Sequence, residues 1–345
     1  MRVLAAMSGG VDSSVAAALL AEAGHEVVGV TLRLWDNPGE GGCCSVAEID
    51  DARRVAQQLG IDHRVFSFTE EFEALVVTPY ADAHAAGRTP NPCIECNRHL
   101  KFGRLLRRAR QLGFDAVATG HHARVRRGPD GRYRLLRGAD STKDQSYVLH
   151  VLDQDRLARC LFPVGELTKA QVRERARTLG LRTADKPDSQ EVCFVTTAGG
   201  REALLGSRIP LHPGRVVDRE GRELGQVDAV ELVTVGQRRG LGTGATGRGD
   251  RRFALAVDVA QRTVLAGPVD DLLTRRVELA GLRWLAPDAE AAVRLDVQCS
   301  AHGTPAAGRI EATTVVFDEP HRRVAPGQSV VLYRGDEVVG GGVAA

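Results

Sequence analysis

The chain has 345 residues and a formal net charge of +2 at pH 7, and 43% of its residues are hydrophobic and 4% aromatic. This length allows two or three domains, and the hydrophobic content is ordinary for a globular protein. The sequence has no run of about 18 apolar residues and no N-terminal signal segment, so we expect a cytoplasmic protein without a membrane partner. The small net charge excludes binding of nucleic acid through overall charge alone.

A glycine turn follows the first apolar run. Residues 3–7 are apolar, residues 8–13 read Ser-Gly-Gly-Val-Asp-Ser, and a helical pattern continues to Gly24. Two consecutive glycines let the backbone approach a ligand closely, and the amides at a helix start attract an anion. The turn lacks the Gly-Lys-Ser/Thr of a Walker P-loop, and the plain alternative is a strand–helix turn capped by serine. We interpret the turn as a phosphate site.

Strand and helix patterns alternate through the first part of the chain. Apolar runs predict strands at residues 27–32, 63–68 and 115–119, and helical patterns cover residues 46–59, 97–112, 154–160 and 169–179. Such βαβ units imply a parallel sheet that binds ligands at the carboxyl ends of its strands.

After about residue 197 the pattern changes to short apolar runs between turns rich in Gly, Asp and Arg. These runs lie at residues 215–217, 232–235, 253–257, 264–266, 293–297 and 330–333, and residues 240–249 form a glycine-rich loop that we expect to be flexible. The pattern predicts small β-barrels after the α/β domain. We therefore place domains at residues 1–197, 198–272 and 273–345.

Two motifs contain cysteines that could carry chemistry. Cys93 and Cys96 form a Cys-x-x-Cys pair at the start of the predicted helix 97–112, and Cys193 lies in the motif of residues 188–194. A thiol at a helix N-terminus can have a depressed pKa, which we expect for Cys96. The pair could be a zinc site, a redox pair or a chance occurrence, but no second Cys-x-x-Cys completes a zinc site. The odd total of seven cysteines argues against a disulfide framework.

Basic residues are concentrated in one stretch. Between Arg98 and Arg137 they greatly outnumber the acidic residues Asp115 and Asp130. Such a stretch suits a phosphate backbone, and a solvated helix face is the alternative.

Together these motifs resemble a known family. The glycine turn is similar to the SGGxDS signature of the ATP pyrophosphatase (PP-loop) superfamily. Along nearly its whole length the chain resembles the bacterial tRNA-specific 2-thiouridylases. The islands that carry this resemblance are residues 8–13, 89–92, 96–97, 101–102, 118–121, 143–147, 161–167, 189–194, 236–242 and 325–328.

The resemblance implies both a fold and an activity. The implied fold class is α/β, with a parallel-sheet PP-loop (adenine nucleotide hydrolase-like) domain followed by two small β domains. The implied activity is ATP-dependent 2-thiolation of the wobble uridine of tRNA by a tRNA-uridine 2-sulfurtransferase. This reaction adenylates uracil O2, transfers sulfur from a cysteine persulfide, and releases AMP and pyrophosphate.

The resemblance also implies roles for residues. Cys193 would carry the persulfide, and Cys96 would be the nucleophile that resolves it, leaving a transient disulfide. ATP would bind Ala6, Met7, Ser8, Gly9, Gly10, Val11, Asp12, Ser13, Leu32 and Gly120. The tRNA would bind Asn91, Pro92, Cys93, His121, Lys143, Asp144, Gln145 and Gln328, with Asn91, Pro92 and Cys93 facing the target base.

Cofactors and partners follow from the same resemblance. Mg²⁺ would neutralise the departing pyrophosphate, with Asp12 as a contact, and we expect no metal site built from protein ligands alone. The expected partners are tRNA and a sulfur-donating relay protein, and we expect a monomer.

Alternatives stay open at this point. Some family members carry Asp where this chain has Cys93, so its role differs here. Cys93, Cys96 and Cys193 could instead bind an iron–sulfur cluster. The chain could have another PP-loop activity on a small molecule, or be a non-catalytic RNA-binding or metal-sensing protein. We assign no role to the remaining cysteines and expect structural thiols at Cys43, Cys44, Cys160 and Cys299.

Overall fold

The computed structural model describes residues 1–35, 46–188, 192–242, 251–286 and 294–345. The chain forms two compact units, which we describe separately. The first unit contains residues 1–77, 92–198 and 336–339, and the second contains residues 78–91, 199–335 and 340–345. Several predicted features lie outside the described residues: Cys43, Cys44, residues 189–191 of the Cys193 motif, and most of the glycine-rich loop at residues 240–249.

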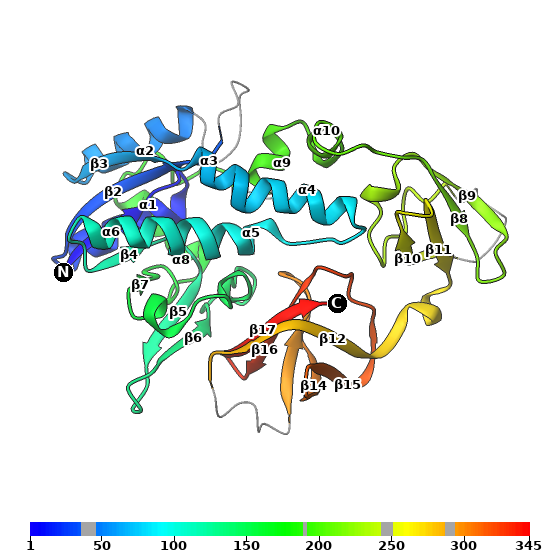
Figure 1. The fold of residues 1–345 in the computed structure, drawn as a ribbon. Coiled ribbons are helices and arrows are strands. Elements are labelled where there is room, and N and C mark those ends of the chain that lie inside the picture. The colour runs from blue at the N-terminus through cyan, green and yellow to red at the C-terminus, as the bar shows by residue number, and fades with distance from the viewer. Residues whose placement is uncertain (36–45, 189–191, 243–250, 287–293) are drawn as a thin grey trace. The chain divides into compact units, whose positions relative to one another are not determined.

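The first unit is built on a five-stranded parallel sheet with the strand order β3-β2-β1-β4-β7 (Figure 1). Its strands are β1 (Arg2–Ala6), β2 (Glu26–Arg33), β3 (Asp62–Ser67), β4 (Ala116–Ala118) and β7 (Cys160–Leu161). The chain passes from β1 outward to β3 and then returns to β4 on the other side of β1. The sheet therefore has a switch point between β1 and β4, where open α/β sheets bind ligands.

Helices bury their apolar faces against this sheet. α1 (Val11–Glu22), α2 (Val46–Gln58) and α8 (Lys169–Thr178) share one core with β1, in which Val3, Val15, Val55 and Val172 are fully buried. The predicted helices at residues 46–59 and 169–179 and the predicted strands of this sheet are confirmed.

The helix predicted at residues 97–112 begins earlier. The chain turns into α5 (Pro92–Glu95), continues through the π-helical segment η2 (Cys96–Leu105) and ends in α6 (Leu106–Gln111). A proline is well suited to the first helical position, because its φ is already helical and its missing N–H is not needed there. Cys96 therefore lies one turn inside the helix and not at its start.

Shorter elements complete the first unit. They are α3 (Thr69–Phe72), η1 (Glu73–Val77), β5 (Ala123–Arg127), β6 (Tyr133–Arg137), η3 (Ser146–Leu149), α7 (Gln154–Leu157) and α9 (Cys193–Thr197). β5 and β6 form an antiparallel hairpin, and Leu135 and Leu136 of β6 pair with Val338 and Glu337. This hairpin was not predicted from the sequence.

The second unit begins with α4 (Thr78–Ala85) and α10 (Arg201–Gly206). A four-stranded sheet follows, in the order β10-β11-β8-β9, made of β8 (Gly214–Val217), β9 (Glu223–Val227), β10 (Phe253–Asp258) and β11 (Thr263–Gly267). The apolar run at residues 232–235 is not a strand, since a 3-10 turn, η4 (Val230–Leu232), occupies its start. A second 3-10 turn, η5 (Val269–Leu272), ends this part.

The last part of the second unit is a barrel of antiparallel strands. Its strands are β12 (Leu273–Trp284), β13 (Leu295–Gln298), β14 (Ala306–Glu311), β15 (Thr314–Arg322), β16 (Ser329–Arg334) and β17 (Glu337–Ala344). β12 pairs with β15 on one side and with β17 on the other, so the sheet closes on itself. The expected α/β class with β domains after it is confirmed, and the three-domain division stays a prediction.

None of the helices in the described part of the chain is both long enough and apolar enough to cross a membrane.

Candidate active site

The glycine turn lies at the carboxyl end of β1. Gly9 has a φ of +73°, and a Cβ there would lie 2.5 Å from the backbone oxygen of Glu48. Gly10 is the N-cap of α1 and makes no side-chain capping bond. The Ser13 hydroxyl instead donates to the Gly10 carbonyl oxygen at 3.0 Å and accepts from the Ser8 N–H at 3.1 Å. The alternative of a serine-capped turn is therefore wrong, and the first amides of α1 remain available to an anion.

The other predicted ATP-binding residues lie at the same edge of the sheet. Leu32 is near the carboxyl end of β2, beside β1, and Gly120 follows β4 on the other side. A Cβ on Gly120 would lie 2.5 Å from the Ser13 backbone nitrogen and 2.7 Å from the Asp12 carbonyl carbon. Only glycine allows β4 and its loop to come this close to the start of α1. The predicted residues of the turn thus share one end of the sheet with Leu32 and Gly120.

Asp12 is the centre of a charged network. Lys169 donates to both carboxylate oxygens of Asp12 at 2.7 Å, and His122 Nε2 lies 3.2 Å from Oδ1. Burial would raise the pKa of Asp12, but hydrogen bonds from His122 and Lys169 outweigh burial and lower it. This network was not predicted from the sequence.

Lys186 and Asp188, which precede Cys193 in the sequence, contact the same turn and its charged network. The Lys186 ammonium donates to the Gly9 carbonyl oxygen at 3.0 Å, and Asp188 contacts Lys169 at 2.9 Å. Asp188 also accepts from Lys143 at 2.8 Å and from Arg173 at 2.7 Å. Burial would raise the pKa of Asp188, but the hydrogen bonds from Lys143 and Lys169 lower it to about 2.

Three thiols from two distant parts of the sequence lie near one another. Cys93 is on α5, Cys96 begins η2 and Cys193 begins α9. The charges of Cys93 and Cys193 both contribute to the raised pKa of Cys96. All three cysteines belong to the first unit.

The expected depressed pKa of Cys96 is wrong. Burial raises the pKa of the Cys96 thiol to about 12, although the charge of Lys101 acts in the opposite direction. The helix begins at Pro92, so Cys96 lies one turn inside it and away from the helix end at which backbone amides would stabilise a thiolate.

Phe194 anchors the position of Cys193. Its ring centroid lies 5.4 Å from that of Phe72 and 6.1 Å from that of Trp35, and its side chain is buried. This aromatic cluster fixes the start of α9 and hence the backbone that carries the Cys193 thiol, which is itself half-buried.

In the described part of the chain, no group of three or more His, Cys, Asp or Glu side chains is arranged to hold a metal ion. Cys93, Cys96 and Cys193 are close enough to affect one another electrostatically but do not form such a group. The iron–sulfur alternative stays a hypothesis.

Comparison with known proteins decides the family. The model for the tRNA methyl transferase HUP domain matches residues 1–197, and that for the aminomethyltransferase beta-barrel domain matches residues 274–344. The tRNA-specific 2-thiouridylase of Chloroflexus aurantiacus is 48% identical, over 99% of this chain and 97% of its own. That of Geobacter metallireducens is 45% identical, over 99% of this chain and 96% of its own. The chain belongs to the tRNA-specific 2-thiouridylase family.

Membership in the 2-thiouridylase family confirms the resemblance inferred from the sequence and the predicted enzyme class, a tRNA-uridine 2-sulfurtransferase. Solved structures are less similar. The NMN synthetase from Francisella tularensis is 21% identical with a TM-score of 0.35, over 59% of this chain and 74% of that one.

Several residues predicted to contact tRNA in this 2-thiouridylase family member form ion pairs or hydrogen bonds with other residues of the protein. Lys143 pairs with Asp188, and the Gln145 side-chain oxygen accepts from the His122 N–H at 2.9 Å. The Asp144 side chain is 5% exposed and accepts from Arg137, the Gly138 N–H and the N–H and hydroxyl of Ser146 at 2.9–3.0 Å. The structure thus gives Asp144 a structural role, and its contact with tRNA stays a prediction.

His121 is also mostly enclosed. Its ring lies 6.0 Å from that of Phe102 and 5.9 Å from that of Phe162, and its Nδ1 is 2.7 Å from the Thr119 hydroxyl. Burial lowers the pKa of His121 well below its usual range, so the ring is neutral.

The remaining predicted contacts belong to both units. Pro92 and Cys93 are in the first unit, whereas Asn91 and Gln328 are in the second. Within the second unit, the Thr89 N–H donates to the Pro326 carbonyl oxygen at 2.7 Å, so the chain before Asn91 lies beside the turn that contains Gln328.

Many side chains of the basic stretch are paired. Arg124 contacts Asp336 at 2.9 Å and Arg126 contacts Glu166 at 2.9 Å. Arg107, Arg108 and Arg110 are exposed on α6. Both expectations for this stretch, a phosphate-binding surface and a solvated helix face, remain compatible with these exposed arginines.

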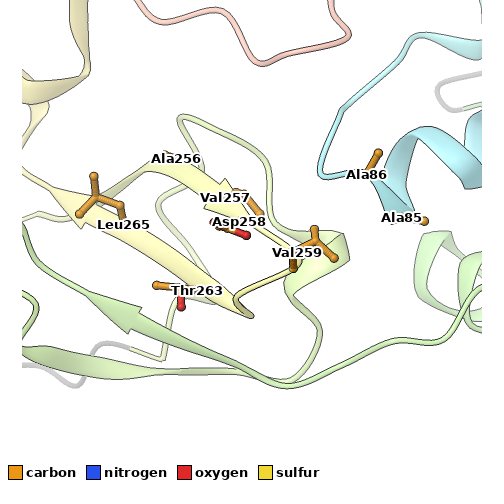
Figure 2. A pocket seen from close by; sticks show the side chains of 9 residues that line it. Ala85, Ala86, Ala256, Val257, Asp258, Val259, Thr263 and Leu265 are labelled. Carbon is orange, nitrogen blue, oxygen red and sulfur yellow. The ribbon is translucent and has the colours of Figure 1, made fainter.

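The second unit has an open cavity of about 610 Å³ between the end of α4 and strands β10 and β11 (Figure 2). Its lining is mostly small and apolar, with Ala85, Ala86 and Val257 at its sides and Asp258 as its acidic residue. None of the predicted site residues lines this cavity.

Proposed function

We propose that the protein catalyses ATP-dependent 2-thiolation of the wobble uridine of tRNA, by adenylation of uracil O2 and transfer of sulfur from a persulfide on Cys193. The names of the relatives support the tRNA substrate and the 2-thiouridine product. The observation that supports the proposed mechanism is that Cys96, Cys193 and the glycine turn belong to one compact unit.

Adenylation solves a chemical difficulty of this reaction. The C2 oxygen of uracil is a poor leaving group, whereas AMP attached to that oxygen leaves readily. The free amides at the start of α1 and the Lys169 ammonium offer positive charge for the phosphates of ATP. Gly9 and Gly120 keep the adjoining backbone close enough to form one cradle.

Asp12 is the carboxylate that we propose Mg²⁺ contacts in this cradle. Mg²⁺ prefers oxygen ligands, keeps several waters and takes substrate phosphates as ligands. Asp12 fits this role as a single contact, although its carboxylate is held by Lys169 in the present arrangement. When bound, Mg²⁺ would neutralise charge on the leaving pyrophosphate.

Sulfur transfer then uses the two cysteines in turn. The terminal sulfur of the Cys193 persulfide attacks C2 and displaces AMP, leaving the base linked to Cys193 through a disulfide. The Cys96 thiolate attacks the Cys193 sulfur, forms the Cys96–Cys193 disulfide and releases the 2-thiouridine. A cellular thiol reductant reopens this disulfide, and a relay protein supplies new persulfide sulfur to Cys193.

The raised pKa of Cys96 has a use in this sequence of steps. Because burial keeps Cys96 protonated in the resting enzyme, the thiol is protected from unwanted oxidation and from premature attack on the persulfide. The positive charge of Lys101 favours the thiolate when attack is required.

The substrate must expose its base to reach these groups. A wobble base is in a loop, and proteins read single-stranded RNA by splaying bases out of the stack. We propose that tRNA is held by the predicted residues Asn91, Pro92, Cys93, His121 and Gln328 together with Lys143, Asp144 and Gln145. We further propose that the enzyme works as a cytoplasmic monomer.

A reconstituted reaction tests the proposal. Unmodified tRNA, ATP and a persulfide donor are incubated with the enzyme, and the digested nucleosides are analysed by mass spectrometry. We expect 2-thiouridine with the wild type, none with Cys193→Ala, and at most one turnover with Cys96→Ser. Cys299→Ser, which changes a cysteine of the second unit, serves as the matched control and should retain activity. Product formation by Cys193→Ala at the wild-type rate would refute the persulfide role.

A further inference from the structure

A turn of the second unit contains two neighbouring arginines to which the proposed function gives no role. Arg238 and Arg239 lie in the island of residues 236–242, and both side chains are exposed. Within the part of the chain that the structure describes, neither guanidinium has an ion-pair or hydrogen-bond partner. Two adjacent positive charges at this turn are therefore available to an anion from outside the protein.

Other exposed arginines of the same unit are paired with carboxylates. Arg219 contacts Asp271 at 3.0 Å and Arg222 contacts Asp218 at 2.7 Å, although these arginine side chains are 57% and 73% exposed. Exposure alone therefore does not leave an arginine of this unit without a carboxylate. The turn differs from its surroundings because its two charges are not neutralised by the protein.

Contacts within the second unit fix the backbone of this turn. The Gln237 side chain accepts from the Thr234 N–H at 3.1 Å and donates to the Arg239 carbonyl oxygen at 2.8 Å. Leu241 is 2% exposed and packs in the core of the four-stranded sheet. Gly242 has a φ of +61°, and a Cβ there would overlap a carbonyl oxygen of β9. Because the backbone is already ordered, binding of an anion costs little conformational entropy of the chain.

The turn is joined to the segment that is proposed to face the target base. The Thr89 hydroxyl donates to the Thr234 hydroxyl at 3.2 Å, and Asn91 follows Thr89 by two residues in the same unit. The Gln237 N–H donates to the Thr234 carbonyl oxygen at 2.9 Å, which closes the turn. The Cα atoms of Arg238 and Asn91 are therefore at most roughly 25 Å apart along this path. A tRNA that presents its wobble base to Asn91 brings phosphates of the same arm to the turn.

Guanidinium groups suit the backbone of a nucleic acid. A guanidinium can donate two parallel N–H bonds to one phosphate, and it is more weakly hydrated than an ammonium. Contacts to phosphates fix the position and register of a nucleic acid without reading its sequence. Two unpaired guanidiniums on an ordered turn therefore favour RNA as the partner over a protein surface.

We propose that Arg238 and Arg239 bind phosphates of the tRNA arm that carries the wobble uridine. They contribute to the affinity for tRNA and to the register of its backbone, and the sulfur-transfer steps do not use them. This inference rests on the proposed tRNA substrate and adds to it a contact surface in the second unit.

Filter binding of unmodified tRNA over a range of salt concentrations tests this surface. The logarithm of the association constant falls linearly with the logarithm of the salt concentration, with a slope of about −0.7 to −0.9 per phosphate contact. Arg238→Gln combined with Arg239→Gln should reduce the size of this slope by about 1.5. At low salt the Kd for tRNA should rise by roughly tenfold or more, the effect of about one charge-assisted hydrogen bond. Arg238→Lys combined with Arg239→Lys keeps both charges and should keep the wild-type slope.

A matched control removes the same charge from the same unit. Arg219→Gln combined with Arg222→Gln also removes two exposed positive charges, but from arginines that pair with carboxylates. This variant should keep a slope close to that of the wild type. Steady-state thiolation gives a second readout, because loss of a phosphate contact raises KM for tRNA and leaves kcat at saturating tRNA unchanged.

The outcomes distinguish this inference from the function on which it rests. If the wild type does not bind tRNA, both proposals are overturned. If the wild type binds tRNA but the glutamine variant at Arg238 and Arg239 has the same slope as the Arg219 and Arg222 control, the surface alone is overturned. The same conclusion follows if that variant binds tRNA normally and loses affinity for the sulfur-donating protein instead. Loss of slope in the variant without thiolation by the wild type would overturn the proposed reaction and leave the RNA surface in place.

Discussion

Substitution of Asp144 tests whether this residue supports the fold or serves only as an RNA contact. Its carboxylate accepts four hydrogen bonds, one of them from Arg137, whose side chain is 18% exposed. Asp144→Ala removes one partner of a buried ion pair and leaves two backbone N–H groups without this acceptor. Removing one partner of a buried pair costs about 3–5 kcal/mol. Because domains are stable by only about 5–15 kcal/mol, we expect a severe loss of stability in the first unit.

Urea denaturation followed by tryptophan fluorescence measures this loss. The chain has two tryptophans, and Trp35 lies in the first unit against Phe72 and Phe194, whereas Trp284 lies in the second. In a Trp284→Phe background the signal reports on the first unit alone. With a urea dependence of about 1–3 kcal/mol per molar, the midpoint should fall by roughly 2 M.

A surface carboxylate provides the control. Glu174 is 72% exposed and pairs with Arg177 at 3.7 Å, so Glu174→Ala should change stability by less than about 0.5 kcal/mol. If Asp144→Ala unfolds at the wild-type urea concentration but binds tRNA weakly, the structural role argued here is wrong and the carboxylate is an RNA contact.

Three further predictions follow from the same site. Gly120→Ala places a Cβ 2.5 Å from the Ser13 backbone nitrogen. The substitution should therefore weaken ATP binding by more than roughly tenfold in calorimetry, while the circular dichroism spectrum stays unchanged. ATP binding at the wild-type affinity would contradict the close approach of the two backbone segments. Asp188 has a pKa of about 2 against an ordinary 3.8, which corresponds to about 2 kcal/mol of stability. Because this pKa is depressed on folding, the stability is present above about pH 4 and is lost as the pH falls toward about 2. The denaturation midpoint of Asp188→Asn should therefore differ from that of the wild type at pH 7 and approach it in acid. A difference that stays constant with pH would refute this origin of the stability. Cys96 has a pKa of about 12, so its alkylation rate in the free enzyme should rise about tenfold per pH unit between pH 7 and 9; a plateau near pH 8 would show that the thiol is not held protonated by burial.

The sequence was sufficient to predict the parallel sheet and its ligand-binding edge. The pattern of an apolar run, a glycine turn and a helix is local, and β1 and α1 follow it closely. Similar local patterns predicted β2, β3 and α8. The hairpin of β5 and β6 was missed because its strands are rich in arginine, and its pairing with Glu337 and Val338 comes from the far end of the chain.

The charged network of the site could not be predicted from local patterns. Lys169 and Asp12 are far apart in the sequence, and the residues around each do not indicate that the two side chains form an ion pair. The pKa of Cys96 was predicted in the wrong direction because it depends on where the helix begins and on burial, and both are set by packing.

The last strand has a practical consequence for anyone who divides this protein into fragments. Glu337 and Val338 of β17 complete the hairpin of the first unit, whereas Gly340, Gly341 and the residues after them close the barrel against β12. An expression fragment that stops near residue 198 would leave β6 with an uncovered edge, which is a template for aggregation. A soluble catalytic fragment would need residues 336–339 grafted back onto the hairpin, and a purification tag is better placed away from the C-terminal strand.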